Sequence, residues 1–81
     1  MLVTIRLFAR LREIAGTHDL RLELPAGAIV ADAWEVLAAR HEALSAYGAS
    51  ISCAVNENYS RMSAPLRDGD EIAFLPPVSG G

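Results

Sequence analysis

Hydrophobic and polar residues alternate along four segments of the chain, which is the pattern of β-strands with one buried face. In the first segment, Val3, Ile5 and Leu7 fall on one side of the strand. We therefore predict strands over residues 3–7, 18–24, 51–55 and 71–75, with a short edge strand within residues 59–64.

A helical period is sustained once. Over residues 30–41, apolar side chains recur every three or four positions and predict the main helix: Val30, Ala33, Trp34, Leu37, Ala38 and His41. The start of this helix is weakly marked, because Ile29 stands where a Ser or Thr would complete a capping box with Asp32. A short helical turn is expected over residues 9–16, and a loose exit from the helix over residues 42–48.

This order of elements favours an α+β fold in two layers, with a mixed sheet packed on one main helix. The first two strands are expected to form an antiparallel hairpin. If the first and last strands are neighbours, the long connection between them makes them parallel. We predict one domain over residues 1–75 and an extended tail over residues 76–81.

Composition limits how much chemistry the chain can enclose. Of its 81 residues, 42 are apolar and 14 of these are alanine, which leaves 28 larger apolar side chains. Small domains bury a smaller share of their surface, so this number fills one core but not a core and a deep pocket. A substrate-engulfing enzyme is therefore not expected. Any chemistry belongs at an edge, at a terminus, or with a partner.

The charge balance is acidic, with ten Asp and Glu against seven Arg and no Lys, for a net charge of −3. A basic surface for nucleic acid is missing, so we predict no nucleic-acid partner. The absence of lysine removes every side-chain amine that could be acylated, although codon bias alone would give the same absence. Arg6 interrupts the first apolar run, and we expect neither a signal peptide nor a membrane span, hence a cytoplasmic protein.

Candidate catalytic side chains are few. His18 and His41 have no Ser or Cys partner nearby in the sequence. Cys53, the only cysteine, is in phase with the buried side of its strand, which indicates a core residue rather than a nucleophile. A single cysteine also excludes a disulfide, a zinc cluster or a four-cysteine iron–sulfur site within the chain. The carboxylates of residues 68–71 are too few to hold a metal and are expected to bond turns, so we predict no metal and no cofactor bound by this chain.

The last six residues differ from the rest: Pro76, Pro77, Val78, Ser79, Gly80 and Gly81. The prolines direct the chain away from the sheet, and six extended residues reach roughly 20 Å. A tail without side chains at its last two positions fits a narrow channel that rejects other chain ends. Its carboxylate becomes an acyl donor only after activation, most simply as a mixed anhydride with AMP. The alternative is an inert, frayed end.

Three segments carry a resemblance to a known family: residues 8–16, residues 54–56 and, most specifically, residues 66–81 with their Asp-Gly-Asp-Glu turn and Phe-Leu-Pro-Pro-Val-Ser-Gly-Gly ending. On these residues the chain resembles the small sulfur-carrier subunits of molybdopterin synthase, which are ubiquitin-like β-grasp proteins. The likeness covers nearly the whole length, and the missing cap at Ile29 is the departure from it.

The resemblance implies a role for the tail. Gly81 would be adenylated with ATP by an activating enzyme related to ubiquitin-activating enzymes, then converted to a thiocarboxylate. Its sulfur would pass to cyclic pyranopterin monophosphate inside the large subunit of molybdopterin synthase, in a heterotetramer of two small and two large subunits. Gly80 would keep the channel entry narrow. The rest of the tail would lie in that channel: Ser79, Val78, Pro77 and Pro76.

Two residues are candidates for a partner interface. Phe8 is out of phase with the inward residues of its strand, and Leu75 lies opposite Ile72 and Phe74. If both are exposed on one face, they form an apolar patch beside the tail, which suits docking. The alternative is that loops cover both.

Three rival functions stay open on the sequence. The first is sulfur delivery to another acceptor such as the thiazole of thiamine, against which the diproline and the chain length argue. The second is a ubiquitin-like modifier joined to lysines of target proteins, and the third is an interaction module with an inert tail.

Overall fold

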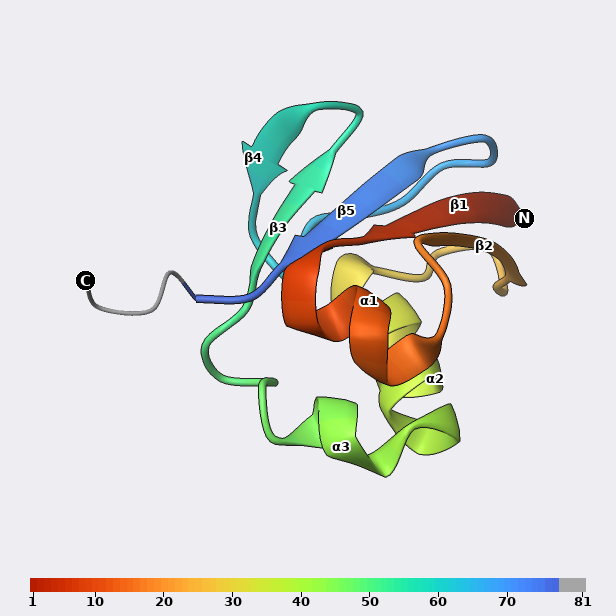
Figure 1. Ribbon diagram of the computed structural model, residues 1–81. Coiled ribbons are helices and arrows are strands. Elements are labelled where there is room, and N and C mark those ends of the chain that lie inside the picture. Colours follow the sequence, from red (N-terminus) through yellow and green to blue (C-terminus); the bar gives the residue numbers. More distant parts are fainter. Residues whose placement is uncertain (78–81) are drawn as a thin grey trace.

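Eight elements follow one another in the computed structural model, which describes residues 1–77 (Figure 1). They are β1 (Leu2–Leu7), α1 (Ala9–Ala15), β2 (Asp19–Glu23), α2 (Val30–Arg40), α3 (Glu42–Ser45), β3 (Ser52–Val55), β4 (Asn58–Ser60) and β5 (Glu71–Leu75).

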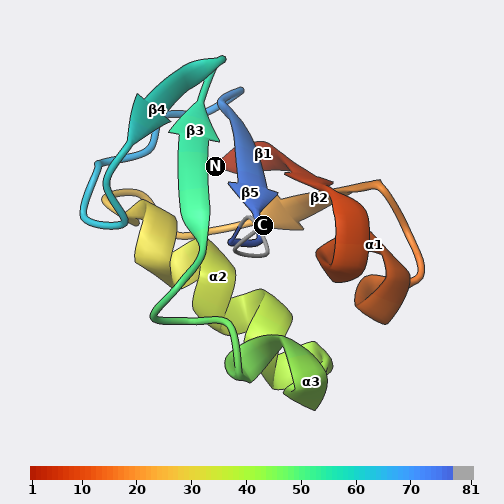
Figure 2. The ribbon, with the colours of Figure 1, turned by 60° about the vertical axis from the view of Figure 1, so that its left-hand side comes forward.

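The five strands form one mixed sheet in the order β2-β1-β5-β3-β4, which Figure 2 shows from right to left. β1 and β2 are antiparallel, and β1 and β5 are parallel, with Leu7 opposite Phe74. Both predictions about strand direction are therefore confirmed. The parallel pair places the ends of β1 and β5 at the same edge of the sheet, although residues 8–70 lie between the two strands in the sequence.

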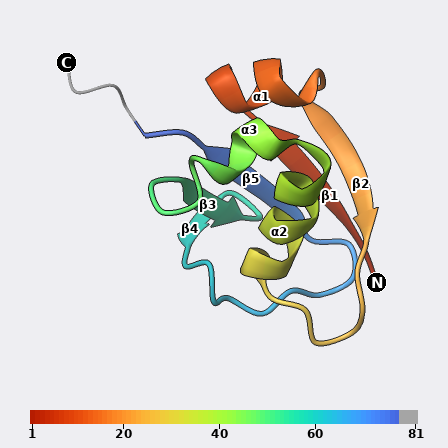
Figure 3. The ribbon, with the colours of Figure 1, turned by 90° about the horizontal axis from the view of Figure 1, so that it is seen from below.

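The helices lie on one face of the sheet (Figures 1 and 3). The inward residues of the strands meet the apolar stripe of α2, as the periodicity predicts. Trp34 packs edge-to-face on Phe74, with ring centroids 5.1 Å apart. The fully buried side chains of this core include Val3, Ile5, Leu7, Leu11, Val30, Leu37, Leu44, Ile72 and Phe74. The opposite face of the sheet carries no helix in the part of the chain that the structure describes.

The N-terminus of α2 has one of the two hydrogen bonds of a capping box. The Asp32 carboxylate accepts a hydrogen bond from the backbone N–H of Ile29 at 2.8 Å. Ile29 has no side-chain acceptor to give the other bond. α1 ends as predicted, at Gly16 in the left-handed conformation with φ of 76°.

Two expectations about boundaries were wrong. Residues 42–45 form the short helix α3 rather than a loose exit, with Leu44 fully buried against the core. The edge strand covers only Asn58–Ser60, because the chain then turns to pair with the start of α2, where Ala64 accepts a bond from the Val30 N–H at 3.0 Å.

Of the acidic residues before β5, Asp70 makes the predicted turn hydrogen bond, whereas Asp68 bonds to the first residue of β1. Asp68 accepts from the N–H of Leu2 at 2.6 Å, and Asp70 accepts from the N–H of Arg67 at 2.8 Å. Asp70 also accepts from the Asn56 side chain at 2.9 Å. These bonds fix the loop that leads into β5, and so fix where the last strand begins.

Candidate functional site

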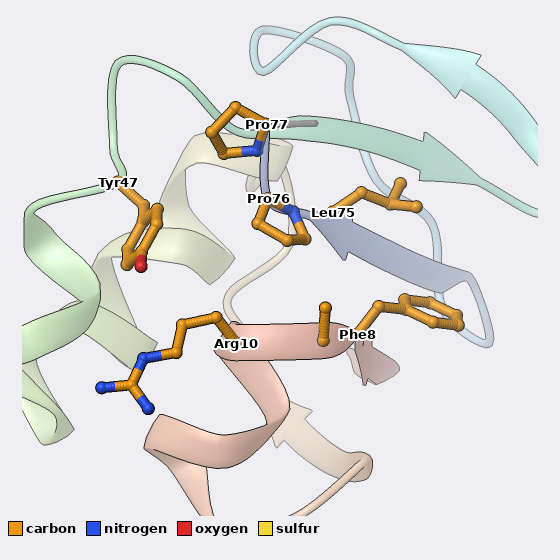
Figure 4. Close-up of a pocket in the computed structure, with 7 residues that line it drawn as sticks. Phe8, Arg10, Tyr47, Leu75, Pro76 and Pro77 are labelled. Carbon is orange, nitrogen blue, oxygen red and sulfur yellow. The ribbon is translucent and has the colours of Figure 1, made fainter. Parts of the chain in front are cut away.

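An apolar groove opens where β5 ends. It has a volume of about 670 Å³, and Figure 4 shows the side chains that line it. They come from three separate parts of the chain: Phe8, Ala9 and Arg10 at the start of α1, Tyr47 after α3, and Leu75, Pro76 and Pro77 at the end of β5.

Phe8 points to the outside because it continues β1 by one residue. Its backbone is extended, with φ of −125° and ψ of 153°, and the preceding residue, Leu7, is fully buried on the inner face. Alternation then places Phe8 outward, where it is 40% exposed. The chain turns into α1 at Ala9, whose φ of 51° lies in the left-handed region and reverses the chain within one residue.

Leu75 reaches the same groove through strand pairing. Leu7 is opposite Phe74, so the next residue of each strand, Phe8 and Leu75, lies on the outer face at the same sheet edge. Leu75 is half-buried there. The two residues that the sequence singled out for an apolar patch therefore line one groove together with the two prolines (Figure 4).

Arg10 gives the groove one charged wall. Its guanidinium donates to the Glu13 carboxylate at 3.0 Å, and this hydrogen bond raises the pKa of Arg10. The Arg10 side chain is 62% exposed, and the guanidinium N–H groups that Glu13 does not use can meet an anionic group of a partner. Tyr47 lies beside Arg10 in Figure 4, with its hydroxyl group toward the Arg10 side chain, and adds an aromatic ring to the apolar lining.

A second exposed surface lies beside the groove on the helix-free face of the sheet. The strand register places Arg6, Ala73, Ala54 and Tyr59 in one row across four strands. Tyr59, on the edge strand, is 83% exposed. The small side chains of Ala54 and Ala73 leave this row flat, and Arg6 at its end pairs with Glu71 at 3.6 Å. We call these four residues the outer row.

Sequence reasoning named Phe8, Leu75 and the prolines, all of which line the groove, but did not name Arg10, Tyr47 or Tyr59. Tyr59 carried a signal, since a large aromatic residue in an edge strand beside a turn has little core to reach. Tyr47 carried none, because its position depends on α3. The predicted tail residues Val78, Ser79, Gly80 and Gly81 lie outside the described residues.

The remaining titratable residues do not assemble into a catalytic cluster among residues 1–77. Cys53 is buried, and desolvation raises the pKa of its thiol. His18 is exposed on the β2 side of the molecule, and His41 caps the end of α2. Within the same residues, no three His, Cys, Asp or Glu side chains lie close enough to hold a metal ion. None of the described helices has the length and apolarity needed to cross a membrane.

Comparison with known proteins gives one family over nearly the whole chain. The sequence pattern that defines the ThiS family matches residues 5–81. The molybdopterin synthase sulfur carrier subunit of Arabidopsis thaliana is 35% identical over 79 residues, covering 98% of this chain and 82% of that protein.

Solved structures agree with the sequence comparison. The crystal structure of small archaeal modifier protein 1 from Haloferax volcanii superposes with a TM-score of 0.87 at 34% identity, and the match covers all of both chains. A complex of subunits 1 and 2 of the molybdopterin-converting factor from Helicobacter pylori contains a chain that matches with a TM-score of 0.66 at 26% identity, again over the full length of both chains. These similarities confirm the predicted ubiquitin-like β-grasp fold.

Proposed function

Because the chain belongs to the ThiS family, we propose that it is a sulfur carrier for molybdopterin synthesis, with the Gly81 carboxyl group as the attachment point. The observation that carries this proposal is where the chain leaves the fold. β5 ends in a diproline beside an apolar groove, and the remaining sequence ends in two glycines.

Three chemical steps follow from a terminal carboxylate. A carboxylate oxygen attacks the α-phosphorus of ATP in an activating enzyme, pyrophosphate leaves, and an acyl adenylate forms. A nucleophile at the oxidation level of sulfide, such as hydrosulfide, then attacks the carbonyl carbon, AMP leaves, and Gly81 carries a thiocarboxylate. When that sulfur has passed to cyclic pyranopterin monophosphate, water restores the carboxylate. The chain itself needs no catalytic side chain for any of these steps. We propose that all three steps take place in the cytoplasm.

The groove and the outer row supply the docking surface for the partner that receives the tail. That partner is the large subunit of molybdopterin synthase, in a heterotetramer of two small and two large subunits. Phe8 and Leu75 offer apolar area next to the tail, and Tyr59 extends it across the sheet face. An aromatic residue flanked by small side chains is a common anchor at protein interfaces. The same surface is available to the ubiquitin-activating-type enzyme, which acts at a different time.

The proposal is tested on Gly81. The full chain is co-produced with the activating enzyme and a sulfur source, and its intact mass is measured. We expect replacement of one oxygen by sulfur, located at Gly81 by fragmentation, and transfer activity with the large subunit. Deletion of Gly81 is expected to abolish both, because the terminal carboxylate then belongs to Gly80 and is one residue too short to reach the reacting groups of the partner enzymes. Glu35→Ala, an exposed substitution on α2 that lies outside both the groove and the tail, is the control and is expected to retain both.

A truncated chain that still supports molybdopterin synthesis would overturn the proposed mechanism. So would a wild-type chain that stays unmodified when the activating enzyme is shown to be active on another carrier.

A second function is favoured by one specific observation, the full-length match to a small archaeal modifier protein. A modifier uses the same activated glycine but transfers the acyl group to an amine of a target protein. The same mass measurement separates the two functions. Sulfur on the free chain supports the carrier, and amide-linked adducts of Gly81 on other proteins support the modifier.

A further inference from the structure

An activated glycine carboxyl group is attacked by amines and thiolates, including those of other copies of the same chain. In such an attack the nucleophile bonds to the carbonyl carbon, AMP or a thiol leaves, and an attacking amine loses a proton. Two activated copies that meet in solution therefore form a covalent dimer whenever one of them presents a nucleophile. Whether they do so depends on which nucleophiles their own surface offers.

Side-chain amines are absent from this chain, because it contains no lysine. Its positive charges are seven arginines, whose guanidinium groups stay protonated and do not attack carbonyl carbons. The exposed His18 imidazole can attack the carbonyl carbon, but water hydrolyses the resulting acyl-imidazole, so this reaction gives no stable product.

The single thiol is sealed in the core. Cys53 is 2% exposed and lies on the inner face of β3, opposite Phe74. Its Sγ lies 3.2 Å from the carbonyl oxygen of Ser60, to which it donates. Burial raises the pKa of this thiol, and the thiolate is the reactive form. The neighbouring Ser52 is exposed, so a shift of one position along the strand would have put a thiol on the surface.

The α-amine of Met1 is occupied. Its ammonium group donates to the carbonyl oxygen of Leu24 at 2.7 Å and to the Glu23 carboxylate at 3.2 Å. The Met1 side chain is 8% exposed, so the residue is packed against the fold. The amine therefore has two partners within the same chain, and it lies at the opposite end of β1 from the groove, roughly 20 Å away for a six-residue strand.

From these three observations we infer that a copy of the chain donates its activated Gly81 acyl group but does not accept the acyl group of another copy. This inference rests on the proposed function, since only an activated Gly81 makes the question matter. An activated pool stays monomeric until a nucleophile of a different molecule takes the acyl group. If the chain also modifies proteins, it is attached in single units and does not build polymers of itself.

The test uses the full chain prepared with a thioester at Gly81, so that no activating enzyme is needed. The thioester form is incubated with unactivated chain in neutral buffer containing a phosphine reductant, and covalent dimers are followed by intact mass. Two variants of the acceptor restore one nucleophile each at exposed sites: Ser52→Cys on β3 and Arg21→Lys on β2. Free cysteamine, added separately, shows that the thioester is reactive.

We expect the wild-type acceptor to give no covalent dimer, while both variants give dimers joined at the substituted position. A wild-type dimer joined at Met1 or Cys53 would overturn the inference. Monomers in every mixture, with cysteamine still acylated, would overturn it as well, because missing nucleophiles would then not be the cause. Since the thioester bypasses the activating enzyme, these outcomes do not depend on whether sulfur transfer to Gly81 occurs.

Discussion

At the scale of single residues, the turn between β3 and β4 shows how a side chain offsets an unfavourable backbone. Asn56 and Glu57 have φ of 50° and 71°, the two successive positive values of a type I′ hairpin turn. Asn56 is well suited to this conformation, and its side-chain oxygen accepts from the Glu71 N–H at 3.0 Å. Glu57 is exposed and carries the steric cost of its Cβ in the left-handed region.

We predict that Glu57→Gly raises the free energy of unfolding by about 0.5–1 kcal/mol, because glycine adopts positive φ without a Cβ clash. Urea denaturation measures the change. Glu35→Gly is the matched control: Glu35 is exposed in the middle of α2, and there glycine lowers the free energy of unfolding by about 1 kcal/mol. A loss of stability at position 57 would contradict this account of the turn.

At the scale of elements, α2 depends on one carboxylate at its start. The helix has no side chain at Ile29 to accept from its first N–H groups, and the Asp32 carboxylate satisfies the Ile29 N–H at 2.8 Å. Asp32 also places a negative charge in the first turn, where the helix dipole favours it. Because α2 supplies Trp34 and Leu37 to the core, the packing of the sheet depends on this helix holding its position.

Replacing Asp32 by Ala is expected to lower the free energy of unfolding by about 1 kcal/mol, since the Ile29 N–H loses its acceptor and the dipole loses its charge. Thermal or urea denaturation gives the value. Glu35→Ala removes a carboxylate one turn further along the same helix and is expected to change stability by less than about 0.5 kcal/mol. Equal effects of the two substitutions would mean that the cap is not what matters.

At the scale of the whole molecule, the core lies on one face of the sheet and the proposed docking surface lies on the other. The helices cover one face of the sheet, and among residues 1–77 no helix covers the other face, which has the groove at its edge. The parallel pairing of β1 and β5 brings Phe8 to Leu75 and to the base of the tail. A partner that receives the tail therefore meets Phe8 at the same time.

Phe8→Ser is expected to weaken binding to the large subunit at least about tenfold, since truncating an aromatic anchor costs more than about 1.4 kcal/mol. Isothermal titration calorimetry on the folded variant measures this. Leu2→Ser is the control, because Leu2 is 42% exposed on the same strand but lies at the end away from the groove. If both variants bind as the wild type does, the groove is not the docking surface.

The sequence by itself determined the elements and their buried sides. Alternation located β1, β2, β3 and β5, and the helical stripe located α2, because these periods depend only on the local geometry of strand and helix. It also put Cys53 in the core and Phe8 out of phase with the inward residues of its strand, while leaving open whether loops cover Phe8. A missing amino acid needs no structure to be seen, so the lack of lysine was equally plain.

Only the tertiary structure decided what these elements bring together. α3 has four residues, too few to show a helical period, and Tyr47 reaches the groove because α3 packs against α1 and α2. The outer row joins Tyr59 to Ala54 and Ala73 through the strand register, which is set by pairing between distant segments. Likewise, the bonds that occupy the Met1 amine exist only because Leu24 lies beside it across the β1–β2 pair. Such contacts depend on long-range packing, which no local pattern encodes.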